Sequence, residues 1–285
     1  MYYNQMMGNE ELREAVQIWE EDPSKATRIY GNVSQWDVSR VTDMSRLFYK
    51  SKRNWTISSW DVSNVTNFAS MFEGASNFNQ DMAVWNTSSA VNMSFMFSGS
   101  TCFDGDISHW DTSNVTDMSF MFSYARYFNQ NIGRWDTSKV STTEGMFWGC
   151  RNFNQNLDWN TSSLKRSSSM FENAVSFNGD VTKWNVSSLR IADRMFKGCV
   201  HFNSDISKWD TQSLERTVEM FKDTETFTSD ISGWNVRNIR FMNKMFKGAS
   251  SFQRNLDSWK ITRVIVMSGV FEECPCLHPK WYSGR

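Results

Sequence analysis

Residues 110–122 read WDTSNVTDMSFMF, and variants of this string recur along the chain. Its tryptophan is the clearest marker, because tryptophans stand 24 or 25 residues apart at Trp36, Trp60, Trp85, Trp110, Trp135, Trp159, Trp184, Trp209, Trp234 and Trp259. A fixed period of this length is the signature of stacked repeats, in which each unit buries its apolar face against its neighbours. We therefore interpret the chain as about ten repeats of 24–25 residues and count positions from each tryptophan, which is position 0.

Two different spacings alternate within one repeat. Positions +5, +8, +11, +12 and +15 are apolar or small, as in Val65, Phe68, Met71, Phe72 and Ala75. Steps of three or four predict one stripe of a helix, and glycine at +14, as in Gly74, suits a left-handed helix stop. The segment 106–111 around Trp110, like its copies in the other repeats, is too short for a helix and predicts a brief strand. The expected fold is α/β: a right-handed solenoid similar to the leucine-rich-repeat class, with one short parallel strand and one helix per repeat.

The chain is expected to form a single domain over residues 1–285. Residues 1–32 would be an N-terminal helical cap, with a helix over 9–22 that begins at Asn9 and stops at Pro23. Residues 33–271 would be the repeats. Residues 272–285 would be the C-terminal cap, with Leu277 in the position that phenylalanine usually occupies.

The run from Trp110 to Phe122, followed by Ala125 and Phe128-Asn129, resembles the BspA-like leucine-rich repeats of bacterial surface proteins and lipoproteins. Similar repeats are also abundant in unicellular algae. The resemblance extends from about Val33 to Leu277. It implies the repeat class and favours binding or adhesion, and it implies no catalytic residues.

Bulk composition and motifs argue against catalysis. Thirty Lys and Arg balance thirty-one Asp and Glu, so the charge gives no reason to expect a nucleic-acid partner, and no apolar run is long enough to span a membrane. The histidines, His109, His201 and His278, lie in distant repeats, and no phosphate-binding loop or nucleophile motif is present. We expect no enzyme activity and no cofactor. Cys274, Cys276 and His278 lack a fourth ligand, so no metal site is expected either.

The cysteines and the rows of Asp and Asn residues are predicted to have structural roles. Cys150 and Cys199 occupy the small core position at +15 and are expected to be unpaired, which favours a reducing compartment such as the cytoplasm or an organelle interior. The cell surface is the alternative if an export signal has been removed. Asp and Asn form two rows, one just after nine of the ten repeat tryptophans and one at Asp81, Asp106, Asn131, Asn156, Asp180, Asp205, Asp230 and Asn255. Turn capping is the favoured role of these rows, and calcium binding between turns is the alternative.

Three groups of residues break the repeat pattern, and function is expected there. Large aromatic side chains replace polar ones on the expected helical face at Phe95, Phe120, Tyr124, Tyr127 and Trp148. Position +8 loses its Met or Phe at Thr143, Ser167, Ala192 and Thr217, which predicts a shallow groove. Lys197, Lys222 and Lys247, joined by Arg194 and Lys244, would align as a basic row, although a solvated face is the favoured explanation.

Two hypotheses for function follow. The first is a non-enzymatic protein-interaction scaffold or accessory subunit that binds a protein partner through the aromatic residues. The second is a surface-exposed adhesin or carbohydrate-binding module. Unpaired core thiols favour the scaffold.

Overall fold

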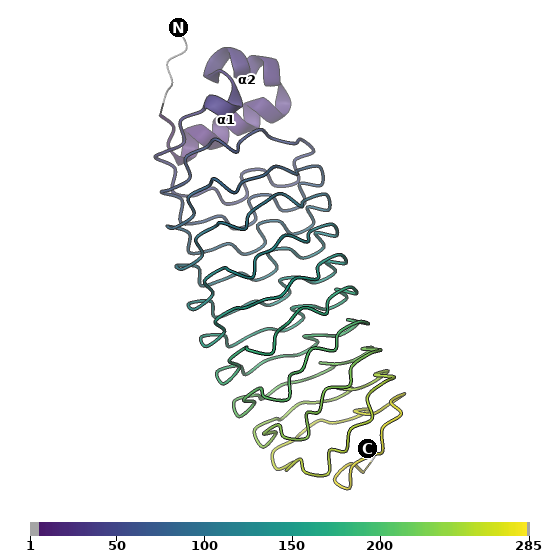
Figure 1. The fold of residues 1–285 in the computed structure, drawn as a ribbon. Coiled ribbons are helices and arrows are strands. Elements are labelled where there is room, and N and C mark those ends of the chain that lie inside the picture. Colours follow the sequence, from purple (N-terminus) through teal and green to yellow (C-terminus); the bar gives the residue numbers. More distant parts are fainter. Residues whose placement is uncertain (1–5, 284–285) are drawn as a thin grey trace.

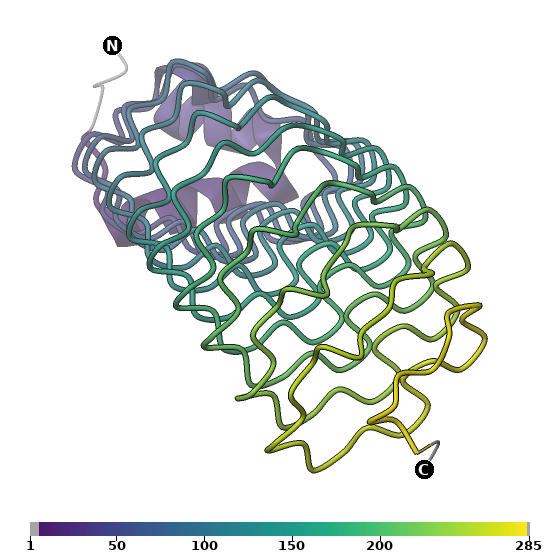
Figure 2. The same ribbon diagram turned by 60° about the horizontal axis from the view of Figure 1, so that its bottom comes forward.

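The computed structural model describes residues 6–283, which form a column of stacked turns with helices at its N-terminal end only (Figure 1). Helix α1 spans Asn9–Glu21, helix α2 spans Pro23–Tyr30, and a 3-10 turn η1 spans Val33–Gln35. Seen from the C-terminal side, the successive turns follow one another with a gradual twist (Figure 2). The long axis of the column is therefore the direction along which repeats are added.

The predicted fold class is wrong. Beyond Gln35, the described part of the chain contains no further helix and no strand, so the repeats are not α/β units. Each repeat is a series of turns, and it pairs with its neighbours only through isolated parallel bridges at position +7, such as Asn67 with Asn92 and Asn92 with Asp117. The short strand predicted before each tryptophan is also absent from these repeats.

The backbone conformation at positions +10 and +14 excludes a helix. Ser70 and Gly74, at these positions of the second repeat, have φ angles of 58° and 71°, whereas an α-helix requires φ near −63°. Each is the third residue of a β-turn, closed by Met71 N–H to the Phe68 carbonyl and by Ala75 N–H to the Phe72 carbonyl. These turns recur every four residues. That period is so close to 3.6 that apolar spacing alone does not distinguish the two structures.

Four of the backbone hydrogen bonds that connect each repeat to the next start at positions +8 to +14, and these four point the same way. In the third repeat Met93, Phe95, Phe97 and Gly99 donate to the carbonyls of Asp117, Ser119, Met121 and Ser123, at 2.7 to 3.1 Å. The same pattern, from +8, +10, +12 and +14 to +7, +9, +11 and +13, occurs at every junction between Met44 and Glu272. These rows of hydrogen bonds therefore leave carbonyl groups without backbone partners in the first repeat and N–H groups without backbone partners in the last repeat.

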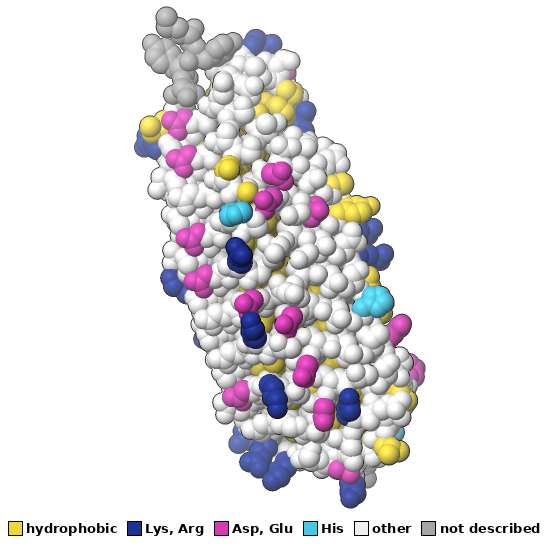
Figure 3. Space-filling view, in the orientation of Figure 1, with side chains coloured by type: hydrophobic (Ala, Val, Ile, Leu, Met, Phe, Trp, Pro, Cys, Tyr) yellow, Lys and Arg dark blue, Asp and Glu magenta, His cyan; other side chains and the backbone are white. Residues whose placement is uncertain are grey.

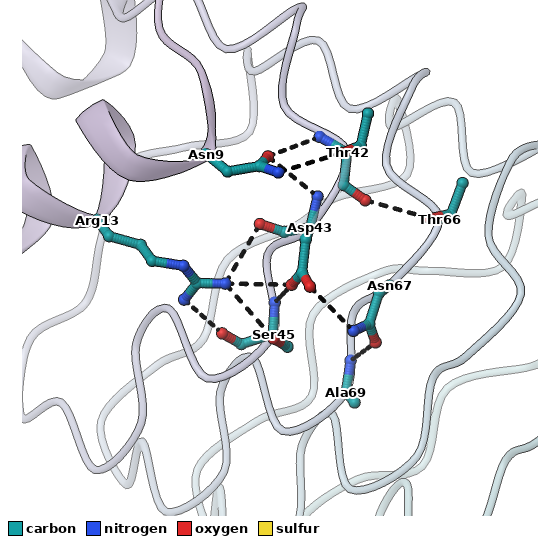
Figure 4. Close-up of polar contacts among 8 residues, drawn as sticks. All are labelled: Asn9, Arg13, Thr42, Asp43, Ser45, Thr66, Asn67 and Ala69. Atoms are coloured by element: carbon teal, nitrogen blue, oxygen red, sulfur yellow. Dashed lines mark hydrogen bonds and ion pairs between the residues drawn. The ribbon is translucent and has the colours of Figure 1, made fainter.

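Helix α1 covers the carbonyl end of these columns (Figure 4). The Arg13 guanidinium donates to the Ser45 carbonyl at 2.7 Å and pairs with the Asp43 carboxylate at 3.1 Å. The Asn9 side-chain oxygen accepts from the backbone N–H of Thr42 and Asp43. A cation at the carbonyl end of aligned peptide dipoles is stabilising for the same reason as at a helix C-terminus.

Aromatic ladders fill the inside of the column, as the sequence predicted. Trp85 and Trp110 stack at 6.1 Å with ring planes 4° apart, and the Trp110 indole N–H donates to the Met82 carbonyl at 2.9 Å. Phe97 packs on Phe103 at 3.9 Å and on its counterpart in the next repeat at 5.7 Å. Burying stacked aromatic rings of this size supplies most of the stabilisation available to a repeat with so little regular secondary structure.

The helix predicted over residues 9–22 is confirmed as α1, but Pro23 begins α2 instead of ending helical structure. At the other end, Leu277 does not take the phenylalanine position, because its side chain is 87% exposed. Trp281 instead continues the tryptophan ladder, stacking on Trp259 at 6.1 Å and donating to the Leu256 carbonyl. Residues 1–5 and 284–285 of the predicted caps lie outside the described residues.

The two Asp and Asn rows cap turns, as predicted. Asp111 accepts from the backbone N–H of Ser113, and Asp106 accepts from the backbone N–H of Ser108, both at 2.9 Å. The pKa values of Asp106, Asp180 and Asp205 lie below the usual value for aspartate. The main cause is the hydrogen bond from the backbone N–H two residues later, and the second is the hydrogen bond from the hydroxyl of that same residue. The ionised form of these side chains is therefore the form that stabilises the turns.

Lowered pKa values in the folded state predict a loss of stability in acid. A depressed pKa contributes stability that is complete above the unfolded pKa of about 3.9 and disappears as the pH falls through the folded value. We expect the urea midpoint of unfolding, followed by circular dichroism, to fall between about pH 6 and about pH 3. The triple variant Asp106→Asn, Asp180→Asn, Asp205→Asn should lose less stability over that range, because asparagine accepts the same bonds without titrating. An equal fall in both proteins would contradict the capping role.

Candidate interaction surface

Side chains at positions +10, +13 and +14 share one face of the column, and their chemistry changes along it. Near the N-terminus Tyr49 packs under Arg46 at 3.9 Å and near Lys50 at 4.9 Å. In the middle the same positions carry aromatic residues, and toward the C-terminus they carry ion pairs. The surface seen in Figure 3 mixes acidic and basic side chains along its length, so no single-sign field dominates that view. The uniform backbone thus carries a face divided into chemical zones.

The middle zone is a contiguous cluster of four rings, Phe95, Phe120, Tyr124 and Trp148, which we call the aromatic patch. Phe95 stacks on Phe120 at 4.8 Å with ring planes 14° apart. Trp148 lies 6.4 Å from Phe120 and 5.2 Å from Tyr124. Phe95 and Tyr124 are 37% and 43% exposed, and Phe120 and Trp148 are half-buried.

Four of the five aromatic residues singled out in the sequence therefore lie together on the surface. The fifth, Tyr127, is 60% exposed at position +17 and forms no ring contact with the other four among the described residues. The face that carries the patch is built from turns and not from helices.

Two glycines in the following repeat form the floor on which the patch rests. A Cβ atom placed on Gly145 would lie 2.3 Å from the ring of Phe120, and one on Gly149 would lie 2.8 Å from the ring of Tyr124. Both glycines also have positive φ angles, 59° and 67°. Sequence reasoning missed Gly145, although glycine at +10 occurs in this chain only there and at Gly269.

The patch carries local energetic costs. Phe95, Phe120 and Tyr124 have φ angles of 57° or 58°, and a bulky side chain in this left-handed region costs about 1–2 kcal/mol. The indole Nε1 of Trp148 is buried without a hydrogen-bond acceptor. An unsatisfied buried donor costs about 1–3 kcal/mol. The left-handed backbone at +10 and +14 recurs along the whole column, so it does not by itself distinguish the patch from the other repeats.

The predicted groove along Thr143, Ser167, Ala192 and Thr217 is wrong. All four side chains are buried, none more than 2% exposed, because position +8 faces the interior. The Thr143 hydroxyl bonds to the Ser167 hydroxyl at 3.3 Å and contacts the Met170 sulfur at 3.2 Å. Small polar residues at this position line the core, so they leave no depression on the surface.

Lys197, Lys222 and Lys247 do recur at one position, but they do not form an uncompensated basic row. Lys197 pairs with Glu172 at 3.2 Å and with Glu219 at 3.0 Å, and Lys247 pairs with Glu272 at 2.7 Å. Lys222 lies 3.9 Å from Asp223. Burial alone would lower the pKa of Lys197, but its hydrogen bonds and proximity to the two glutamates outweigh burial and raise it. This zone is an ion-pair lattice.

The cysteines behave as predicted in the core. Cys150 and Cys199 are free and fully buried, and burial raises the pKa of both thiols. At the C-terminal end the Cys274 and Cys276 sulfurs are 3.0 Å apart. Within residues 6–283 no three His, Cys, Asp or Glu side chains are grouped so that they could hold a metal ion.

Comparison with protein families gives one match. The family model described as Mycoplasma protein of unknown function, DUF285, matches residues 20–130, 81–184 and 176–281. The chain belongs to this family. The three successive matches agree with the repeat architecture, whereas the likeness to BspA-like proteins stays a resemblance. A search of curated proteins finds no match. Within residues 6–283, neither α1 nor α2 is long and apolar enough to cross a bilayer.

The glycine floor gives a direct test of how the patch is held. We expect Gly145→Ala to destabilise the protein by about 1–2 kcal/mol, because it adds a side chain at positive φ, and to displace the Phe120 ring. Gly233→Ala is a suitable control, since a Cβ there meets nothing within 4 Å. Urea unfolding measures stability, and the near-ultraviolet circular dichroism of the aromatic side chains reports the patch. Equal effects of the two substitutions would show that Phe120 does not rest on Gly145.

Proposed function

We propose that this protein is a non-enzymatic interaction scaffold that binds a partner protein through the aromatic patch. The observation that carries the proposal is the placement of Phe95, Phe120 and Tyr124, whose apolar rings are partly exposed side by side on the surface of the column. Other repeats put Gly, Ser, Asn or charged residues at these positions. Apolar ring surface exposed to water raises the free energy of the free protein, and a partner that covers the rings would offset that cost.

The composition of the surface around the patch supports protein binding. Interface centres are enriched in aromatic residues and are surrounded by polar rims, and a few central residues carry most of the binding energy. Here stacked rings occupy the centre, and the ion pairs of Lys197 lie on the C-terminal side. The rings are also fixed in advance by their contacts with each other and with the glycine floor, which reduces the entropy lost on binding.

Membership of a repeat family of unknown function is consistent with a protein-interaction or surface repeat protein. A glycan is the competing ligand for the same rings, because Phe95 and Tyr124 expose apolar ring surface on which a sugar could also pack. The two ligand classes are separable by the same experiment.

Removing two rings should abolish binding without unfolding the protein. We expect Phe120→Ala with Trp148→Ala to weaken partner binding at least about 30-fold, equivalent to about 2 kcal/mol, as for other aromatic hot spots. Tyr49→Ala is the matched control because it removes an aromatic ring from the same position, +13, outside the patch. Lys222→Ala should weaken binding only slightly.

The measurements are retention of proteins from native material on immobilised wild type and variants, binding of the same wild type and variants to a glycan array, and thermal unfolding of each variant. Loss of the partner from the double variant, with its unfolding transition intact, supports the proposal. Retention of the partner by the double variant, or binding of glycans to the rings with no protein partner, contradicts it.

A further inference from the structure

A second surface feature lies away from the aromatic patch, in the last five repeats. It is a groove of about 970 Å³ between the side chains at positions +3 and +4 and those at +6. Its charged wall contains Lys165, Arg190, Glu215 and Arg240, and Arg263 closes its C-terminal end. Ser188, Gln212 and Asn238 are among the neutral polar groups that line it. The groove runs across successive turns, parallel to the axis of the column.

The groove has an excess of positive charge that the protein itself does not neutralise. Arg190 pairs with Glu215 at 2.6 Å, and Arg263 donates only to the neutral Asn238 amide at 3.0 Å. Among the described residues, Lys165 and Arg240 have no carboxylate within ion-pair distance. Three cationic side chains are therefore left without a negative partner.

Arginines just outside the groove provide a contrast. Arg166 and Arg216, at position +7, each reach an acidic residue of the preceding repeat, Glu144 at 2.9 Å and Asp193 at 2.8 Å. The arginines at +7 are thus neutralised by carboxylates of the preceding repeat, whereas cationic side chains at +4 and +6 of the groove have no such carboxylate partners.

The earlier repeats form an internal comparison for the same positions. There, +6 is occupied by Thr42, Thr66, Val91, Thr116 and Ser141, none of them charged. From the sixth repeat onward the residues are Lys165, Arg190, Glu215, Arg240 and Ile265. The backbone at +6 is the same in both halves, since each N–H there donates to the preceding +6 carbonyl, as in Thr116 to Val91 and Arg240 to Glu215. The scaffold therefore does not require the basic residues.

We infer that this groove binds an extended acidic segment of a partner polypeptide. Arginine guanidinium groups match carboxylates in geometry as well as in charge. The neutral Ser, Gln and Asn side chains offer donors and acceptors for a peptide backbone. No aromatic residue lines the groove, so the stacking that single-stranded nucleic acids use is missing. Glu215 interrupts the basic wall, which disfavours a polymer with a negative charge at every step.

This site is independent of the proposed function, because it shares no residue with the aromatic patch. The probe is a fluorescein-labelled decapeptide of alternating Glu and Ser, and its binding to the full chain is measured by fluorescence anisotropy at low salt. We expect binding that weakens as salt rises. Arg240→Glu should weaken it at least about 10-fold, because the substitution removes one ion pair and adds a repulsive charge. Arg240→Lys, which keeps the charge and removes the planar fork, should have a smaller effect.

Two controls make the test specific. Lys25→Glu makes the same change from positive to negative on exposed helix α2, far along the chain from the groove, and should leave peptide affinity unchanged. A peptide with Gln in place of Glu should not bind. The inference is overturned if Arg240→Glu and Lys25→Glu weaken binding equally, if the acidic peptide does not bind, or if a sulfated oligosaccharide binds in the groove and the peptide does not.

Discussion

The structure depends on four backbone hydrogen bonds that cross every junction between repeats in the same direction. Because N–H groups at +8, +10, +12 and +14 all point toward the next repeat, the segment cannot form the internal bonds of a helix. Two residues per repeat, at +10 and +14, have left-handed backbone conformations, and the N–H groups of +8, +10, +12 and +14 point toward the next repeat. The column is therefore held together mainly by bonds and ring contacts between repeats, and each repeat needs a neighbour on both sides.

This direction also gives the column two different ends. At the carbonyl end, Arg13 and Asn9 of α1 satisfy groups of the first repeat. At the other end, the amides of Met267, Gly269, Phe271 and Glu273 have no backbone acceptor among residues 6–283. Trp281 covers the tryptophan ladder there but does not pair with this row. The N-terminal cap thus satisfies polar groups, whereas the C-terminal residues mainly cover apolar ones.

Much of this architecture could be predicted from the sequence, and the main failure is the helix expected in each repeat. The period, the ladders of Trp110 and Phe97, the α1 helix and the turn-capping aspartates follow from residue type and spacing. The helix prediction failed because a four-residue turn period and a 3.6-residue helical period place the same side chains inside. The backbone φ angles distinguish a series of turns from a helix. Gly145, a glycine at +10 in addition to the glycines at +14, was the sign in the sequence that +10 has a positive φ angle.

The candidate site was only partly predictable from the sequence. Four aromatic residues were identified correctly as surface neighbours because each breaks the pattern of its position. The groove at Thr143 failed because the small polar side chains at +8 are packed and hydrogen-bonded inside the core. The lysine row failed because its acidic partners, such as Glu172, come from other repeats. The basic groove at Arg240 needed the three-dimensional stack, since its walls combine positions from successive repeats.

Hydrogen exchange of two glycine amides tests the one-way bonding most directly. Gly145 and Gly269 both occupy +10 with φ near 60°, but Gly145 donates to the Ser168 carbonyl at 2.8 Å, whereas Gly269 belongs to the last repeat and has no backbone acceptor among residues 6–283. The account predicts that the Gly145 amide, followed by nuclear magnetic resonance, exchanges slower than Gly269 by roughly two orders of magnitude or more. Equal protection of the two amides, as internal helical bonding would give, would contradict it.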